Sequence, residues 1–403
     1  MNNKFNAIMP IAKRPETVFV SGQGSFLTDE LGNTYLDFIQ GWAVNTLGHN
    51  HPTLVKAIKT QAQTLINPSP GFYNAPMIRL ADLLVEHSVF DQVFFTNSGA
   101  EANEGAIKLA RKWGSLNKKS AYKIITFDNG FHGRTLATMS ASGKKGWDSL
   151  LEPKVPGFIK VPFNDLGAVC EVIDQQTVAI MLEPIQGEAG VIPADMDFIQ
   201  GLRKLADEHQ LLLIFDEIQT GVARTGELFC YQHFNIEPDI MTLGKGLGGG
   251  VPLAALLAKK QISCFELGDQ GGTFNGNPLV TAAGYAIIIE VLQPGFLQDV
   301  KHKSKFLQQC LNKLAKKHKL GAVRGRGLLL ALDTRMIDAT IIVKHAFEQK
   351  LLLNAPRKNS LRFMPALNVT IAEIEQMIAL LDSVLSDMLC KYSTNTYYLE
   401  SAS

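Results

Sequence analysis

A lysine between glycines and an acid at the end of an apolar segment are the residues of this sequence best suited to chemistry. Lys245 lies in the run 242–250 (TLGKGLGGG), and Asp216 follows the apolar segment 211–215 (LLLIF). A lysine amine can form a Schiff base with an aldehyde, and an acid can keep a proton on a pyridine nitrogen so that the ring accepts electrons. The pair therefore indicates an enzyme that uses pyridoxal phosphate, with Lys245 and Asp216 as catalytic residues.

Each of these two residues also has an ordinary explanation when it is taken alone. A lysine between glycines is usually part of a surface loop, and an acid after an apolar strand often only caps a helix. The catalytic interpretation depends on the two residues occurring together, and on three further motifs in the same chain.

The segment 96–104 (TNSGAEANE) has the residues of a phosphate site. It follows a predicted strand and opens a predicted helix, whose first backbone N–H groups are free to bind an anion. Gly99 allows the backbone to approach a phosphate, and Ser98 adds a hydroxyl donor. The alternative is an ordinary helix cap, in which Ser98 is the N-cap and Glu101 completes a capping box.

The segment 127–135 (FDNGFHGRT) offers an aromatic ring and an arginine. Phe131 can stack on a flat ring, and Arg134 can hold a carboxylate through two parallel hydrogen bonds. The alternative places Phe131 in the core and Arg134 in a surface salt bridge.

Three loops follow other predicted strands or precede a helix. Glu188, in the loop 183–190 (EPIQGEAG), is a candidate partner for a substrate or for an arginine, and Gln219 can reach the ring hydroxyl of pyridoxal phosphate. The alternatives are a solvated acid and a simple turn hydrogen bond. The glycine-rich turn 271–278 (GGTFNGNP) is by default a flexible surface loop.

Composition excludes several other classes of function. The 403 residues include 39 Lys and Arg against 38 Asp and Glu, so no net charge favours nucleic acid or an anionic membrane. Five cysteines form no C-x-x-C pair, which argues against disulfides and a metal site. The sequence has neither a signal-peptide pattern nor an apolar run of about 18 residues. We expect a cytoplasmic protein that acts on small molecules.

Strand and helix patterns alternate through the middle of the chain, which is typical of an α/β fold with a mostly parallel sheet. The pattern changes after about residue 285 to long helices with a few short strands. We expect an N-terminal segment (1–50) that packs with a smaller C-terminal α+β domain (286–403), and a large cofactor-binding domain (51–285). The predicted strands of the large domain are 93–95, 124–127, 179–182, 211–215 and 240–243.

Taken together, the motifs resemble those of the class III, ornithine-type aminotransferases, which use pyridoxal phosphate. The segments that carry this resemblance, which covers nearly the whole chain, are 97–103, 131–135, 183–188, 216–221, 244–246 and 272–274. It implies fold type I: a large domain with a mainly parallel seven-stranded sheet, a small α+β domain, and a homodimer with active sites at the subunit interface.

The resemblance also implies a role for each matching residue. Thr273 is implied to reach the cofactor phosphate of the neighbouring subunit, and Arg362 to hold the α-carboxylate of 2-oxoglutarate or glutamate with Glu188 as its switchable counter-ion. The implied cofactor-binding residues are Ser98, Gly99, Ala100, Phe131, Asp216, Gln219, Lys245 and Thr273. The implied substrate-binding residues are Arg134, Glu188 and Arg362.

Three further segments, 41–49, 67–74 and 361–367, resemble the acetylornithine-specific branch of the family. This implies transfer of the δ-amino group of N2-acetyl-L-ornithine to 2-oxoglutarate in arginine biosynthesis, with N-acetyl-L-glutamate 5-semialdehyde and L-glutamate as products. The alternatives within the family are succinylornithine, succinyldiaminopimelate, ornithine and 4-aminobutyrate as amino donors.

Two alternative functions lie outside this enzyme class. A scaffold or regulator that has kept only cofactor binding is disfavoured because each catalytic position carries the expected residue type. A nucleotide-binding protein is disfavoured because the segment around Ser98 lacks both a G-x-x-x-x-G-K-[ST] run and a G-x-G-x-x-G turn.

Overall fold

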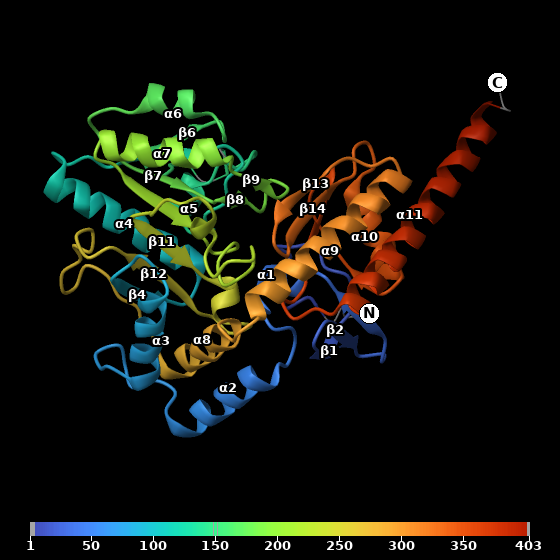
Figure 1. Cartoon of the computed structure of the whole chain (residues 1–403), viewed down its shortest axis with the longest axis horizontal. Coiled ribbons are helices and arrows are strands. Elements are labelled where there is room, and N and C mark those ends of the chain that lie inside the picture. Colours follow the sequence, from blue (N-terminus) through green and yellow to red (C-terminus); the bar gives the residue numbers. More distant parts are fainter. Residues whose placement is uncertain (1–4, 148, 151, 401–403) are drawn as a thin grey trace.

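A seven-stranded sheet lies at the centre of the larger half of the molecule (Figure 1). The structure is a computed structural model that describes residues 5–147, 149–150 and 152–400. In sheet order the strands are β4 (Gln92–Thr96), β12 (Ala254–Ala258), β11 (Ile240–Leu243), β10 (Leu212–Asp216), β7 (Thr177–Leu182), β5 (Lys123–Phe127) and β6 (Phe158–Val161). Strand β12 is antiparallel to both of its neighbours and the other pairs are parallel. The mainly parallel seven-stranded sheet is thereby confirmed.

Helices cover both faces of this sheet because successive side chains of each strand point to opposite faces. In β10, Leu213 packs in the core that includes α7 (Met196–Glu208). The next residue, Ile214, packs in the core that includes α4 (Gly99–Asn117). Residues on alternate positions of β10 and β11 therefore face α4. The same alternation determines which face of the sheet the polar residues at the ends of these two strands occupy.

Five of the seven strands match the predicted ones to within two residues, whereas β6 and β12 were not predicted. Strand β12 has the sequence AALLA, without β-branched or aromatic residues. Its composition favours a helix, and its position between two strands, with every residue buried, overrides that preference.

Two smaller sheets form the other half of the molecule. One has the order β13 (Val323–Arg326), β14 (Leu329–Asp333), β17 (Ser360–Phe363) and β16 (Asn354–Arg357). The other has the order β1 (Phe19–Gln23), β2 (Phe26–Asp29), β3 (Thr34–Asp37) and β15 (Leu351–Leu352). Because β15 pairs with β3, an N-terminal strand and a C-terminal strand share a sheet. The domain boundaries near residues 50 and 285 stay a prediction.

Helices α9, α10 and α11 lie beside the smaller sheets, and α11 extends outward from them (Figure 1). The helices not yet given are α1 (Gln40–Ala43), α2 (Pro52–Thr64), α3 (Ala75–Glu86), α5 (Leu136–Ala141), α6 (Leu166–Val172), α8 (Pro278–Val291), α9 (Phe296–Lys317), α10 (Ala339–Glu348) and α11 (Ile371–Glu400). Within the described residues no single helix is long and apolar enough to cross a bilayer. Helices α8 and α9 together reach that length, but they are bent by 74° and bury apolar side chains in the core.

Candidate active site

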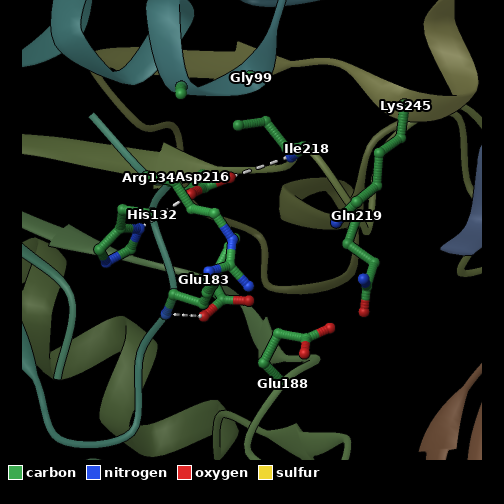
Figure 2. Close-up of a pocket in the computed structure, with 12 residues that line it drawn as sticks. Gly99, His132, Arg134, Glu183, Glu188, Asp216, Ile218, Gln219 and Lys245 are labelled. Atoms are coloured by element: carbon green, nitrogen blue, oxygen red, sulfur yellow. Dashed lines mark hydrogen bonds and ion pairs between the residues drawn. The ribbon is translucent and has the colours of Figure 1, made fainter. Parts of the chain in front are cut away.

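A cavity of about 270 Å³ lies at the carboxyl ends of the parallel strands, where open α/β sheets bind ligands (Figure 2). Segments that follow β5, β7, β10 and β11 contribute side chains to it, and the start of α4 closes one end. The predicted site residues that line it are Gly99, Ala100, Phe131, Arg134, Glu188, Asp216, Gln219 and Lys245. The cavity therefore brings together residues separated by up to 146 positions in the chain.

Lys245 begins the short helix η2 (Lys245–Leu247) directly after β11. Its backbone has a φ of 41°, in the left-handed region, which costs energy for a residue with a side chain. Burial, reinforced by the positive charge of Arg362, lowers the pKa of the Lys245 amine, although the nearby acids oppose this shift. Within the described part of the chain this amine has no hydrogen-bond partner, so it is available as a nucleophile.

Asp216 ends β10 with its carboxylate fixed by three hydrogen bonds. Oδ2 accepts from Nδ1 of His132 at 2.8 Å and from Nδ2 of Asn103 at 2.7 Å. Oδ1 accepts the Ile218 N–H at 3.1 Å. The side chain is 3% exposed, so these three donors hold the carboxylate in one orientation.

The start of α4 combines an ordinary helix cap with a possible anion site. The Ser98 hydroxyl accepts the Glu101 N–H at 3.3 Å, so Ser98 is the N-cap of the predicted alternative. The Glu101 carboxylate accepts the Asn97 N–H at 2.8 Å instead of the Ser98 N–H that a capping box requires. Gly99 and Ala100 nevertheless line the cavity with the first, unpaired N–H groups of the helix. A Cβ on Gly99 would lie 2.6 Å from the Ile218 side chain, so only glycine lets the helix end approach this closely.

Both acids of this helix start point away from the cavity, as anion binding requires. Glu101 is engaged by Asn97, and Glu104 accepts a hydrogen bond from the Thr135 hydroxyl. Neither acid lines the cavity. Ser98 does not line it either; its side chain is exposed and caps α4.

Arg134 extends into the cavity beside two aromatic rings. Its guanidinium carbon lies 5.9 Å from the centre of the Phe131 ring and 5.4 Å from that of Trp147. Cation–π attraction holds the guanidinium in place without neutralising it. Because no described residue forms an ion pair with Arg134, the predicted alternative of a surface salt bridge is absent here, and the arginine is free to take a carboxylate.

A second arginine, Arg362 on β17, is paired with an acid. Its Nη1 donates to Glu188 Oε1 at 2.7 Å and to Gln219 Oε1 at 3.3 Å, and its Nε donates to Asn354 at 3.0 Å. Arg362 is 1% exposed, whereas the Glu188 side chain is 29% exposed. Burial alone would raise the pKa of Glu188, but the positive charges of Arg362 and Lys245 lower it below its usual value. The pair joins the smaller half of the molecule to the cavity.

Glu183 is a further acid in the cavity, for which the sequence indicated no role. Its carboxylate accepts the Phe131 N–H at 2.8 Å and the Gly187 N–H at 3.2 Å. Burial, together with the negative charge of Asp216, raises the pKa of Glu183 to about 7. Glu183 thus ties the loop that carries Phe131 to the loop that carries Glu188.

His132 and Asn103 also contact Asp216 and were missed. One signal for Asn103 was its position in α4, where a polar side chain lies on the buried face with Ala102 and Ala106. His132 had no comparable signal, because its contact with Asp216 joins two distant loops.

Thr273 lies outside this cavity, in the exposed loop that precedes α8. Asn275 of the same loop accepts a hydrogen bond from Asn97 at 2.8 Å, so the loop runs beside the start of α4 without bringing Thr273 into the cavity lining. The contact of Thr273 with a neighbouring subunit's cofactor stays a prediction.

Comparisons with known proteins agree on the family of this chain. The sequence matches the family described as Aminotransferase class-III over residues 9–385. It is 59% identical over 386 residues to a protein named Acetylornithine aminotransferase 2 from Bordetella bronchiseptica, covering 95% of this chain and 98% of that protein.

Solved structures with the same architecture include two of related name. The N-acetylornithine aminotransferase of Stenotrophomonas maltophilia K279a has a TM-score of 0.83 and 35% identity, covering 94% of this chain and 98% of that one. A structure of the ornithine aminotransferase from Toxoplasma gondii, described as having partial occupancy of PLP at its active site, has a TM-score of 0.91 and 30% identity. That match covers 95% of this chain and 92% of the other.

Proposed function

Since this chain belongs to the class III aminotransferases, we propose that it transfers the δ-amino group of N2-acetyl-L-ornithine to 2-oxoglutarate. The products are N-acetyl-L-glutamate 5-semialdehyde and L-glutamate. The observation that carries the proposal is the convergence in one cavity of Lys245, Asp216 and Arg134, which forms no ion pair with a described residue. The name of the 59% identical relative supports the choice of acetylornithine.

The residues of the cavity fit pyridoxal phosphate. Lys245 holds the cofactor covalently, the Asp216 carboxylate faces the ring nitrogen, and Phe131 stacks on the ring. The Gln219 amide would contact the ring hydroxyl, and Gly99 and Ala100, at the start of α4, would face the phosphate. Phosphate binding by the Ser98 hydroxyl would require it to leave the helix cap that it forms in the structure. When bound, this cofactor supplies an aldehyde that takes up the amino group and a ring that spreads negative charge.

The side chains divide the remaining work between binding and proton transfer. The Lys245 amine would accept the proton that leaves the substrate carbon, and burial lowers its pKa, which favours the neutral form that can accept a proton. Arg134 binds the α-carboxylate of acetylornithine, so that the δ-amine at the other end of the substrate reaches the reacting centre.

Glu188 and Arg362 allow one cavity to accept two substrates of different shape. While they are paired, Arg362 is neutralised and does not attract the amino donor's carboxylate. When Glu188 swings away, which its partial exposure permits, Arg362 binds the α-carboxylate of 2-oxoglutarate. The paired state in the structure is the one suited to the amino donor.

We extend the proposal to a cytoplasmic homodimer with shared active sites. Thr273, which does not line its own chain's cavity, contacts the phosphate of the partner subunit's cofactor. The neighbouring Phe274 and Tyr73 are 61% and 87% exposed, which fits a surface that a second subunit covers.

A competition between amino donors tests the substrate assignment. Purified enzyme receives equal concentrations of acetylornithine, succinylornithine, succinyldiaminopimelate, ornithine and 4-aminobutyrate, with 2-oxoglutarate as acceptor, and each product is quantified. We expect acetylornithine to be consumed with the highest kcat/KM. Faster consumption of another donor assigns the enzyme to that substrate, and no consumption of any donor contradicts the proposal.

Replacing Arg134 by alanine should weaken the binding of acetylornithine selectively. The loss of a bidentate hydrogen bond to the substrate carboxylate should raise the KM for acetylornithine by about 10- to 100-fold. The absorbance of the bound cofactor and the reaction with 2-oxoglutarate should stay near wild type, because Arg362 serves the acceptor. Arg134→Lys keeps the charge but not the planar fork of the guanidinium. Its KM for acetylornithine should lie between those of wild type and Arg134→Ala. Equal effects on both substrates would contradict the assigned role of Arg134.

A further inference from the structure

A chain of buried hydrogen bonds holds Asp216 in place. It is formed by residues that do not line the cavity. The Thr242 hydroxyl donates to Oδ1 of Asn103 at 2.7 Å. Nδ2 of Asn103 then donates to Asp216 Oδ2 at 2.7 Å and to the His132 carbonyl at 2.7 Å. Thr242 and Asn103 are 0% exposed, so solvent cannot replace these contacts.

The sheet register brings these residues together. Asp216 on β10 and Thr242 on β11 are paired positions of neighbouring parallel strands, so their side chains lie on the same face. That face is covered by α4, whose residue Asn103 lies between them. An amide at this helix position spans the two strand ends.

The hydrogen-bond partners determine which way the Asn103 amide points. In the observed orientation, the carbonyl oxygen receives the Thr242 hydroxyl and the NH2 group meets two acceptors. A flipped amide would place its oxygen against the Asp216 carboxylate and the His132 carbonyl, leaving three acceptors without a proton between them. Asp216 and the His132 carbonyl therefore determine the orientation in which Asn103 donates to Asp216, and the Thr242 hydroxyl supplies the proton that the Asn103 oxygen then accepts.

We infer that Asn103 and Thr242 are positioning residues for the aminotransferase reaction: they hold Asp216 Oδ2 so that Oδ1 faces the ring nitrogen of the cofactor. Both side-chain donors to Asp216 lie on Oδ2, whereas Oδ1 accepts only the Ile218 N–H among the described residues. The inference rests on the proposed function, because it assumes that pyridoxal phosphate occupies the cavity.

Two substitutions of Thr242 separate the loss of its hydroxyl from a change in core volume. Thr242→Val has nearly the same volume but cannot donate to Asn103, whereas Thr242→Ser keeps the hydroxyl. The apo-protein is titrated with pyridoxal phosphate, and the visible absorbance of the lysine-bound cofactor is then followed against pH. We expect Thr242→Val to raise the Kd for the cofactor by about 10-fold and Thr242→Ser to stay within about two-fold of wild type.

The pH titration separates a positioning role from a merely structural one. When Asp216 holds the ring nitrogen less firmly, that nitrogen is protonated in a smaller fraction of the molecules. An unprotonated ring nitrogen repels the proton on the Lys245 nitrogen less strongly. The midpoint of the absorbance change should therefore rise by about one pH unit in Thr242→Val. The other charged groups that act on Lys245, which are Glu188, Arg362 and Glu183, are unchanged in this variant.

Thr126 provides a matched control. It is also a buried threonine, on β5, but its hydroxyl has no hydrogen-bond partner among the described residues. Thr126→Val should leave the Kd and the pH midpoint as in wild type. If Thr126→Val and Thr242→Val behave alike, the effect comes from the loss of any buried hydroxyl and the inference is overturned.

Replacing Asn103 by alanine tests the other member of the pair, with an expected rise in the cofactor Kd of about 10- to 100-fold. Should this variant fail to fold, the two Thr242 variants decide the outcome. A wild-type protein that never shows a Lys245-dependent absorbance band contradicts the proposed function. Normal binding by wild type with no change in Thr242→Val or Asn103→Ala contradicts only this inference.

Discussion

Replacing Lys245 by alanine is expected to abolish both the absorbance of the covalently bound cofactor and turnover. The substitution removes the only amine that lines the cavity among the described residues, and with it the carrier of the proton. Because positioned acid–base groups alone contribute about 10² to 10⁴ in rate, kcat should fall by at least about 10²-fold. Absorbance spectra and product formation from acetylornithine measure the two effects.

A surface lysine serves as the control for this substitution. Lys301 is half exposed and pairs with Glu227 on the outside of the molecule, so Lys301→Ala should keep the cofactor band and wild-type kcat. Transamination that persists in Lys245→Ala would discard the assignment of the catalytic lysine.

Asp216→Asn is expected to keep the cofactor attached but to slow the reaction by about 10²- to 10³-fold, the usual effect of removing one preorganised electrostatic partner. His132 and Asn103 both donate to Oδ2, so the amide oxygen of the new side chain must take that position. Its NH2 group then faces the cavity, where a neutral donor cannot stabilise a protonated ring nitrogen. Single-turnover kinetics with acetylornithine would separate this loss from changes in substrate binding.

An acid outside the cavity controls for the loss of a buried charge. Asp239 accepts the Leu213 N–H at 2.8 Å and pairs with Arg203, at the amino end of β11. Asp239→Asn should change thermal stability without slowing the single turnover. If Asp216→Asn reacted as fast as Asp239→Asn, the ring nitrogen would have another partner.

Much of this site was predictable because it is built from local patterns at strand ends. Lys245 and Asp216 were recognisable from a glycine-rich run and an apolar segment, and glycine at position 99 marks a close backbone approach. Parallel strands end at one edge of a sheet, so residues that follow different strands were expected to meet there. Local patterning also predicted five of the seven strands.

The sequence by itself determined the residue types that the chemistry requires and the strands and helices that present them, because these depend on side-chain chemistry and on hydrophobic periodicity. Only the tertiary structure decided the partners of those residues. The free guanidinium of Arg134, the pairing of Arg362 with Glu188, and the Thr242–Asn103 support of Asp216 each join segments far apart in the chain. No local pattern encodes such contacts, since they arise from strand order, register and the helix that covers each face.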